Sequence, residues 1–386
     1  MTRASAAPSP HSTTSVTRAE VLAYRCRAQG LDRASADVRQ LTVWDLGLQD
    51  TPSGSAAMSL AARLPGGAGA VPDLGDARSW LSVWATRGAP VVLRAGDERA
   101  FAQALWPVDA ADAVARLAGN GQQLKKAQVD PIEAIRVTAE AMRSVVEGTM
   151  PKGEVSTEVT KLLPESYITW CRPCNAHHLG DQLMRLSGLP AGTRLVQGAD
   201  RATLAPIAGW PGVPTAAAGT DRLVRAYLGL NGPATAGEVA AFLGTNQKAI
   251  KASWPAEELV AVTVDGAKAW LAEADLDMLL EARVPDLVRL LPRCDPWMLA
   301  RDRSLIVPDK AHQKVLWPVL GAPGAVLADG EVVAAWRTRA SGKRVTLTVQ
   351  AFDRLTKRVR AAVEEEAANV AQLRGVADLE VVLADA

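Results

Sequence analysis

A short stretch near the middle of the sequence contains two cysteines and two histidines at metal-binding spacing. Cys171 and Cys174 are separated by two residues, and His177 and His178 follow them. Two thiolates in this arrangement can bind a zinc ion, with either histidine as a third ligand. No fourth ligand follows at a supporting spacing, so the cysteines could instead be small core residues or a redox pair. Zinc is therefore a candidate cofactor, and the sequence indicates no nucleotide cofactor.

A second group of polar side chains precedes a proline. Gln49, Asp50 and Thr51 follow an apolar segment that we predict to be helical, and Pro52 prevents simple continuation of that helix. These side chains are expected at the helix end or in the turn after it, where they can face a cleft. The alternative is that Gln49 hydrogen-bonds the backbone at the helix end and contacts no ligand.

Basic side chains gather in two parts of the chain, where they could contact the phosphates of a nucleic acid. They are Lys248, Lys251 and Lys268 in the first part, and Arg337, Arg339, Lys343 and Arg344 in the second. For the second group, a solvated hairpin face without a ligand is the alternative interpretation.

The stretch from Pro233 to Leu271 positions the first group of lysines. Thr235 and Glu238 have the spacing of a capping box, which predicts a helix that ends at Gly244. A second helix is predicted over residues 247–254, and it carries two of the lysines on one side.

A hairpin is predicted directly after these two helices. Asp265-Gly266 lies between alternating runs, which is a strong signal for a tight turn, and the returning strand carries Lys268. Helix, turn, helix and hairpin is the winged-helix arrangement, which commonly places its second helix in a nucleic-acid groove. Winged helices also serve as protein-docking modules, so a protein-interaction scaffold is a competing interpretation.

Weaker signals suggest further modules on the N-terminal side. A degenerate second copy would contain helices at Ser156–Leu163 and Cys174–Leu186, with Thr193–Gln197 in its wing. Closer to the N-terminus, an apolar helix is predicted around Trp80–Ala85 and a strand over Pro90–Leu93.

Beyond Val284 the pattern changes to strands. Turn signals at Asp329-Gly330 and Ser341-Gly342 separate alternating runs. A helix from Asp353 to about Gln372 is predicted next, followed by a last strand at Asp378–Leu383. This order suggests a β-rich terminal domain.

At 386 residues the chain is long for one core, so roughly two to four domains are expected. The predicted fold class is α+β, with three tandem winged-helix modules followed by a C-terminal β-rich, barrel-like domain. The predicted units are a disordered tail at 1–16, winged-helix regions at 17–120, 121–216 and 217–284, and the β-rich domain at 285–386.

Composition limits the class of partner and the compartment. The chain has 43 Lys and Arg against 42 Asp and Glu, so any nucleic-acid surface must be a local basic patch. No apolar run approaches the roughly 20 residues of a membrane span, and the N-terminal stretch lacks the apolar segment of a signal peptide. Four cysteines without framework spacing fit a reducing cytoplasm, and the heavy use of Ala, Arg and Val is typical of a bacterial source.

Motifs near the C-terminus identify a family resemblance. They are the runs Leu291–Leu299, Asp302–Ser304 and Val326–Arg337, together with His312. These residues resemble the winged-helix DNA-binding family of AlkZ-type bacterial DNA glycosylases, and the likeness extends over most of the chain. The resemblance implies three tandem winged helices and a terminal β-barrel around a channel for double-stranded DNA. It also implies excision of bulky alkylated bases or unhooking of crosslinks.

The catalytic motif of that family is only partly present. The resemblance implies a Gln-aliphatic-Gln or Gln-aliphatic-Asp motif in the first region, and the matching residues here are Gly47-Leu48-Gln49-Asp50-Thr51. Gln49 is either the second motif position, with Gly47 replacing the first, or the first, with Thr51 replacing the second. In a glycosylase, Gln49 would orient the attacking water, and Asp50 would act as a base if it reaches the same cleft.

Three functions therefore compete. The leading hypothesis is a DNA-binding protein that acts as a monofunctional DNA glycosylase. A non-catalytic regulator or damage-binding protein is the first alternative, because one motif glutamine is missing, and the protein-interaction scaffold is the second. Binding of duplex DNA requires the cationic sides of the modules to line up along one trough.

Overall fold

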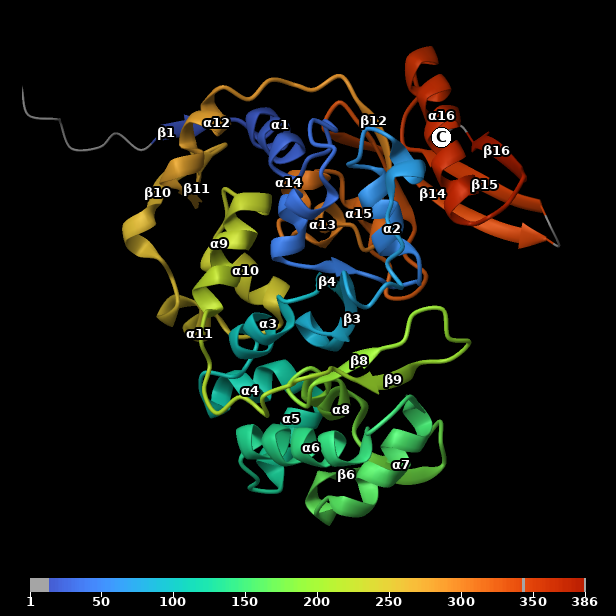
Figure 1. Cartoon of the computed structure of the whole chain (residues 1–386). Coiled ribbons are helices and arrows are strands. Elements are labelled where there is room, and N and C mark those ends of the chain that lie inside the picture. The colour runs from blue at the N-terminus through green and yellow to red at the C-terminus, as the bar shows by residue number, and fades with distance from the viewer. Residues whose placement is uncertain (1–13, 342–343, 385–386) are drawn as a thin grey trace, which may run out of the picture.

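The computed structural model describes residues 14–341 and 344–384, which form a mixed α+β structure (Figure 1). Within these residues the strands form four separate sheets, and none of the sheets closes into a barrel. The largest sheet has six strands in the order β2 (Leu48–Gln49), β4 (Pro90–Arg94), β3 (Trp80–Trp84), β8 (Thr193–Leu195), β9 (Thr203–Pro206) and β5 (Met150–Pro151). The next has five, in the order β12 (Val288–Leu291), β13 (Gly324–Ala328), β14 (Glu331–Ser341), β15 (Arg344–Ala351) and β16 (Asp378–Ala384).

Two smaller sheets complete the strand inventory of the described residues. One contains β1 (Thr14–Val16), β10 (Leu259–Val264) and β11 (Ala267–Ala272), and the other is the hairpin of β6 (Ile168–Cys171) and β7 (Ala176–Leu179). The predicted disorder of residues 1–13 lies outside the described residues, whereas residues 14–16 form β1, which pairs in parallel with β10.

Helices connect and cover the sheets. In chain order they are α1 (Arg18–Ala28), α2 (Ser55–Ala61), α3 (Glu98–Ala104), α4 (Ala110–Leu117), α5 (Gly119–Lys126), α6 (Pro131–Val145), α7 (Lys152–Leu162), α8 (Asp181–Gly188), α9 (Thr220–Asn231), α10 (Ala236–Leu243), α11 (Gln247–Ala252), α12 (Leu276–Leu280), α13 (Pro296–Leu299), α14 (Arg303–Ile306), α15 (Lys310–Leu316) and α16 (Lys357–Leu373). None of these helices has the length and apolar character needed to cross a bilayer.

The local predictions for the stretch from Pro233 to Leu271 are confirmed. Thr235 and Glu238 form a reciprocal capping box at the start of α10, and Gly244 ends the helix in the left-handed conformation with φ of 71°. The second helix is α11, and the turn at Asp265-Gly266 joins β10 to β11 as a hairpin. The assignment of these elements as a winged helix stays a prediction.

One predicted helix on the N-terminal side is wrong, and a second begins later than predicted. Trp80–Trp84 is the strand β3, whose five residues are all buried between layers. A short apolar run has no period that separates a buried strand from a buried helix, and pairing with β4 decides the outcome. Residues 174–179 are also not helical, because Asn175 adopts a left-handed turn and Ala176–Leu179 is β7, so the helix begins only at Asp181.

The barrel-like C-terminal domain is replaced by an open sheet. One face of this sheet packs against α16, through Val359, Val363 and Val370. The other face packs against apolar residues of α13 to α15, which include Trp297 and Leu316. Because helices bury both faces, the sheet has no need to curl around its own core. The helix and the last strand predicted for this region are confirmed as α16 and β16.

Buried ion pairs join segments that are far apart in the sequence. The Arg63 guanidinium binds both carboxylate oxygens of Asp295, at 2.7 and 2.9 Å, and both side chains are fully buried. It also donates to the carbonyl oxygens of Gln29 and Ser59. Arg63 follows α2 and Asp295 caps α13, so the pair joins the N-terminal segment to the C-terminal one.

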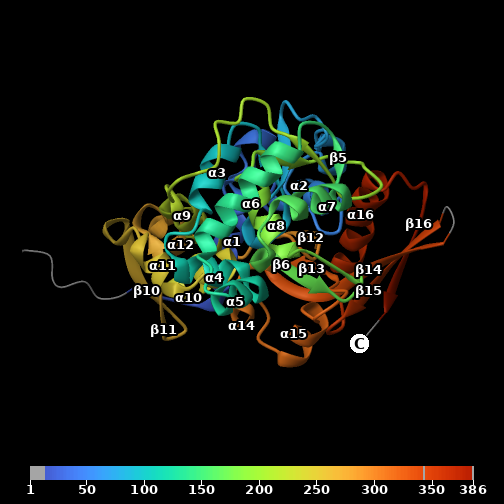
Figure 2. The same cartoon turned by 90° about the horizontal axis from the view of Figure 1, so that it is seen from below.

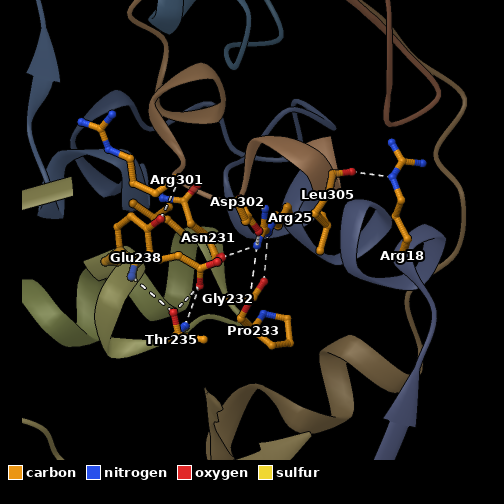
Figure 3. A network of polar contacts seen from close by, with 12 residues as sticks. Arg18, Arg25, Asn231, Gly232, Pro233, Thr235, Glu238, Arg301, Asp302 and Leu305 are labelled. Carbon is orange, nitrogen blue, oxygen red and sulfur yellow. Dashed lines mark hydrogen bonds and ion pairs between the residues drawn. The ribbon is translucent and has the colours of Figure 1, made fainter. Parts of the chain in front are cut away.

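A second pair extends this connection to the central helices (Figure 3). Arg25 on α1 forms an ion pair with Asp302 at 2.5 Å and donates to the carbonyl oxygens of Asn231 and Gly232 at the end of α9. The N-terminal helix therefore contacts both the central and the C-terminal parts of the chain, and buried polar contacts connect these parts to one another.

Removal of one member of the buried pair should destabilise the protein strongly. Arg63→Met leaves Asp295 charged and buried, so we expect the free energy of unfolding to fall by roughly 3–5 kcal/mol. Denaturant titration followed by circular dichroism measures this loss. Glu133→Ala, which breaks an exposed pair with Arg136, is the control and should leave the free energy of unfolding nearly unchanged. Equal losses in the two variants would contradict the role assigned to Arg63.

Candidate active site

Gln49 lies on the strand β2, not at a helix end as predicted. The apolar residues before it form 3-10 turns at Val38–Gln40 and Thr42–Asp45, and β2 then pairs with β4 so that Gln49 is opposite Val91. The register at the edge of a sheet, not a helix terminus, therefore sets the direction of the Gln49 side chain.

The preceding Gly47 has no room for a side chain. Its φ is +71°, and a Cβ atom there would lie 2.5 Å from a methyl group of Val91 and 2.7 Å from one of Leu93. A glutamine at this position would collide with the sheet core. In the register that makes Gln49 the second motif position, the backbone therefore leaves no room for a first glutamine at residue 47.

Two residues from distant segments hold the amide of Gln49. Its Oε1 accepts a hydrogen bond of 3.2 Å from Arg87 Nη2, and its Nε2 donates to the sulfur of Cys294 at 3.2 Å. A guanidinium group only donates hydrogen bonds, so the amide oxygen must face Arg87. Oε1 keeps a second lone pair, which can accept a hydrogen bond from a ligand or a water molecule.

Arg87 connects this site to the central helices. It occupies the turn between β3 and β4 with a positive φ of 60°, and it donates to the carbonyl oxygen of Phe242 in the last turn of α10. Its guanidinium also lies 5.3 Å from the Phe242 ring centroid, a cation–π contact. Gln49 is therefore close to the turn that leads from α10 into α11.

Uncompensated positive charge lies near Gln49. Burial, together with the nearby charge of Arg301, lowers the pKa of Arg87 to about 10. Burial also lowers the pKa of Arg301, whose Nε is buried without a hydrogen-bond partner. Arg293 donates to the carbonyl oxygen of Thr51 at 3.1 Å. In the described part of the chain no carboxylate pairs with these three cations, so the site is suited to an anion.

The Asp50 carboxylate contacts a different segment from the Gln49 amide. Its Oδ1 accepts a hydrogen bond of 3.0 Å from the backbone N–H of Ala56, at the start of α2. Burial raises the pKa of the Asp50 carboxyl, although the backbone N–H groups of residues 54–56 oppose the shift. The described contacts of Asp50 and Gln49 have no residue in common, so Asp50 supports the segment before α2.

A groove of about 530 Å³ lies beside this segment. The start of α2 forms one wall, and Arg293, Trp336, Arg337 and Arg374 contribute to the others. Arg337 is exposed on β14 and is one of the predicted DNA contacts. The groove therefore brings one predicted cation together with two that the sequence analysis did not select.

The other predicted cations are divided between two parts of the molecule. Lys248 and Lys251 are exposed on α11, and Lys268 is exposed on β11 with its Nζ 4.9 Å from the Trp270 ring centroid. Figures 1 and 2 both place α11 and the β14–β15 strands at opposite ends of the molecule. Arg339 and Arg344 are exposed on β14 and β15, and Lys343 lies outside the described residues. No single cluster unites the described cations, and a partner that contacts both groups must span the protein.

The cysteine–histidine stretch forms the hairpin of β6 and β7. The sulfur atoms of Cys171 and Cys174 and a ring nitrogen of His178 all lie within 4.8 Å of one another. His177 is directed elsewhere, because its ring contacts Trp170 at 5.1 Å between centroids. The backbone N–H of Cys174 lowers the pKa of the Cys171 thiol, and the Cys171 side chain in turn raises the pKa of the Cys174 thiol.

Sequence reasoning missed Arg87 and Cys294 as neighbours of Gln49, and Arg301 as a neighbour of Arg87. Cys294 and Arg301 belong to or closely follow the run that carries the family resemblance, but their sequence context assigns them no contact with Gln49. Arg87 stands in a turn between two apolar strands, where no local signal distinguishes it from a solvent-exposed arginine.

Comparison with known proteins identifies the family. Residues 44–373 match the family model described as DNA glycosylase AlkZ-like. The chain belongs to the AlkZ-like DNA glycosylase family. The matched range of the AlkZ-like chain includes Gln49, Arg87, Cys294 and the cysteine–histidine hairpin.

Individual relatives agree with this assignment. An interstrand DNA cross-link repair glycosylase of Streptomyces sahachiroi is 29% identical over 183 residues, which are 45% of this chain and 48% of that protein. The match thus spans about half the length of the curated relative. The structure of Streptomyces sahachiroi DNA glycosylase AlkZ superposes with a TM-score of 0.74 at 21% identity, over 96% of this chain and 100% of that chain. The two proteins share a fold.

The raised pKa of Asp50 predicts a pH-dependent stability difference. A carboxyl whose pKa is higher in the folded state contributes stability when protonated, and this contribution is lost as the pH rises through the folded pKa. Asp50→Asn does not titrate, and its amide oxygen can still accept from the Ala56 N–H. We therefore expect the native protein to lose stability relative to Asp50→Asn between about pH 4 and about pH 7. Denaturant midpoints at the two pH values test this, and a constant difference would contradict it.

Proposed function

We propose that this AlkZ-like protein is a DNA repair glycosylase in which Gln49 orients the attacking water. The observation that carries the proposal is the fixed amide of Gln49, whose free lone pair adjoins a cationic site within the family-matched range. We further propose that the substrate is double-stranded DNA with a bulky alkylated base or a crosslink. The name of the Streptomyces relative supports the crosslink.

The proposed reaction breaks the bond between the sugar carbon C1′ and the base nitrogen. An alkylated purine carries a positive charge, so it leaves with the bonding electron pair as a neutral base and needs little acid catalysis. The water oxygen forms the new bond to C1′ and releases a proton to solvent or to a nearby base. Gln49 Oε1 accepts a hydrogen bond from this water, which positions it and increases the electron density on its oxygen.

The cations around Gln49 have a complementary role in the proposal. Arg87, Arg293 and Arg301 lack carboxylate partners in the described residues, and DNA phosphates next to the damaged nucleotide would neutralise them. Their neutralisation matters for catalysis, because free positive charge would oppose the positive charge that develops on the sugar. Binding of DNA would therefore neutralise the positive charge of the site before the bond to the base breaks.

Removal of the Gln49 amide should abolish most base release and leave DNA binding intact. For Gln49→Ala we expect base release from duplex containing a methylated purine to slow by roughly 10²-fold or more. Single-turnover assays with saturating protein separate this loss from any change in affinity. Gln122→Ala, at an exposed position on α5, is the matched control and should react like the native protein.

The absence of one motif glutamine is compatible with a competing function. Since Gly47 cannot accept a side chain, a non-catalytic damage-binding protein or regulator is consistent with the same structure. Salt-sensitive binding of damaged duplex without base release by the native chain would establish this alternative. Absence of DNA retention would instead support a protein-interaction scaffold.

The cationic groove predicts a second effect on DNA binding. Arg337→Ala should weaken binding to all duplex sequences similarly and reduce the slope of log affinity against log salt by about 1. Fluorescence anisotropy at several salt concentrations measures both quantities. Arg136→Ala, whose side chain pairs with Glu133 and Glu140 on α6, should leave the slope unchanged. An unchanged slope in Arg337→Ala would remove the groove from the DNA-contact surface.

A further inference from the structure

We infer that the hairpin of β6 and β7 is a zinc-binding site formed by Cys171, Cys174 and His178. The three candidate ligand atoms lie within 4.8 Å of one another. Tetrahedral zinc with two sulfur ligands and one nitrogen ligand places these atoms roughly 3.5–3.8 Å apart. Small side-chain rotations are therefore sufficient to close the three ligands around one ion.

The orientation of His178 is that of a metal ligand. Its Nδ1 lies 2.7 Å from the carbonyl oxygen of Leu179, which can only accept, so the ring proton belongs on Nδ1. Nε2 is then an unprotonated acceptor, and it is buried without a hydrogen-bond partner. Metal-binding histidines commonly use one ring nitrogen in this way to fix the other toward the ion. A cation bound beside the two thiols would give the unpaired Nε2 a ligand.

The backbone of the turn is shaped to present both sulfur atoms. Asn175 adopts a positive φ of 50°, which asparagine tolerates better than most residues, and its N–H bonds to the carbonyl oxygen of Arg172 at 3.3 Å. This tight turn places Cys171 and Cys174 on the same side.

A bound ion would stabilise the exposed end of the hairpin. Its two strands form a sheet of their own; Leu179 at its base is buried in the core, whereas residues 172–177 around its turn are exposed. Its described polar tie to α7 is a hydrogen bond of 3.0 Å from the Leu179 N–H to the Thr160 hydroxyl. Zinc would link the two strands at the turn, with a water molecule as fourth ligand because Cys174 is exposed. The soft thiolate pair favours zinc over magnesium or calcium.

This site is separate from the proposed glycosylase site. Figure 1 shows β6 and α7 in the lower part of the molecule, away from β4, the strand that pairs with β2 and its Gln49. The zinc would stabilise the hairpin and would take no part in base excision. Zinc binding can therefore succeed or fail independently of the role of Gln49.

Metal analysis of the full-length protein purified under reducing conditions tests the inference. We expect about one zinc per chain in the native protein and in His177→Ala, and close to none in Cys174→Ser and His178→Ala. His177→Ala is the matched control, because the neighbouring ring faces Trp170 and not the thiols. Circular dichroism identifies any variant that has lost its fold.

A second measurement on the native chain needs no substitution. Chelation should lower the melting temperature, and added zinc should restore it. Cobalt in place of zinc should give sulfur-to-metal charge-transfer absorption in the native protein and in His177→Ala. Failure of the reduced chain to bind zinc would overturn the inference. So would a requirement for His177 instead of His178, or recovery of a metal-free Cys171–Cys174 disulfide as the native form.

Discussion

The bidentate ion pair between Arg63 and Asp295 is the interaction on which the arrangement of this protein depends. Both charges are fully buried, so each needs the other to avoid a large desolvation cost. The pair joins the end of α2 to the start of α13, and Cys294 directly precedes Asp295. Because Asp50 holds the opposite end of α2, the same helix sets the separation between the segment that carries Gln49 and the segment that carries Cys294.

The Arg63–Asp295 pair positions Cys294, which is one of the two residues that hold the Gln49 amide without a second motif glutamine. The Gln49 amide is fixed by an arginine from the β3–β4 turn and a cysteine from the C-terminal part of the chain, whereas the neighbouring carboxylate of Asp50 serves the helix. The excess positive charge around the site is costly in the isolated protein and becomes favourable with an anionic partner. Family membership and electrostatics thus both favour DNA as that partner.

The cysteine–histidine hairpin follows the same logic on a smaller scale. A short element with little apolar surface requires another source of stability, and its turn gathers two sulfur atoms and an unpaired ring nitrogen. The exposed lysines and arginines at the two ends of the molecule differ from this hairpin, because exposed charges are hydrated and need no bound ion for stability. Because of their separation, only an extended partner could contact both groups.

Local signals in the sequence determined the capping box at Thr235, the turn at Asp265-Gly266, and the final helix and strand, because each depends on neighbours within a few residues. The family likeness was also visible in the sequence, through motifs spread along the chain. Tertiary structure alone decided that Trp80–Trp84 is a strand, that the C-terminal sheet stays open, and that Arg87 and Cys294 hold Gln49. These outcomes depend on which surfaces bury one another across hundreds of residues. Apolar periodicity in a short window cannot contain that information.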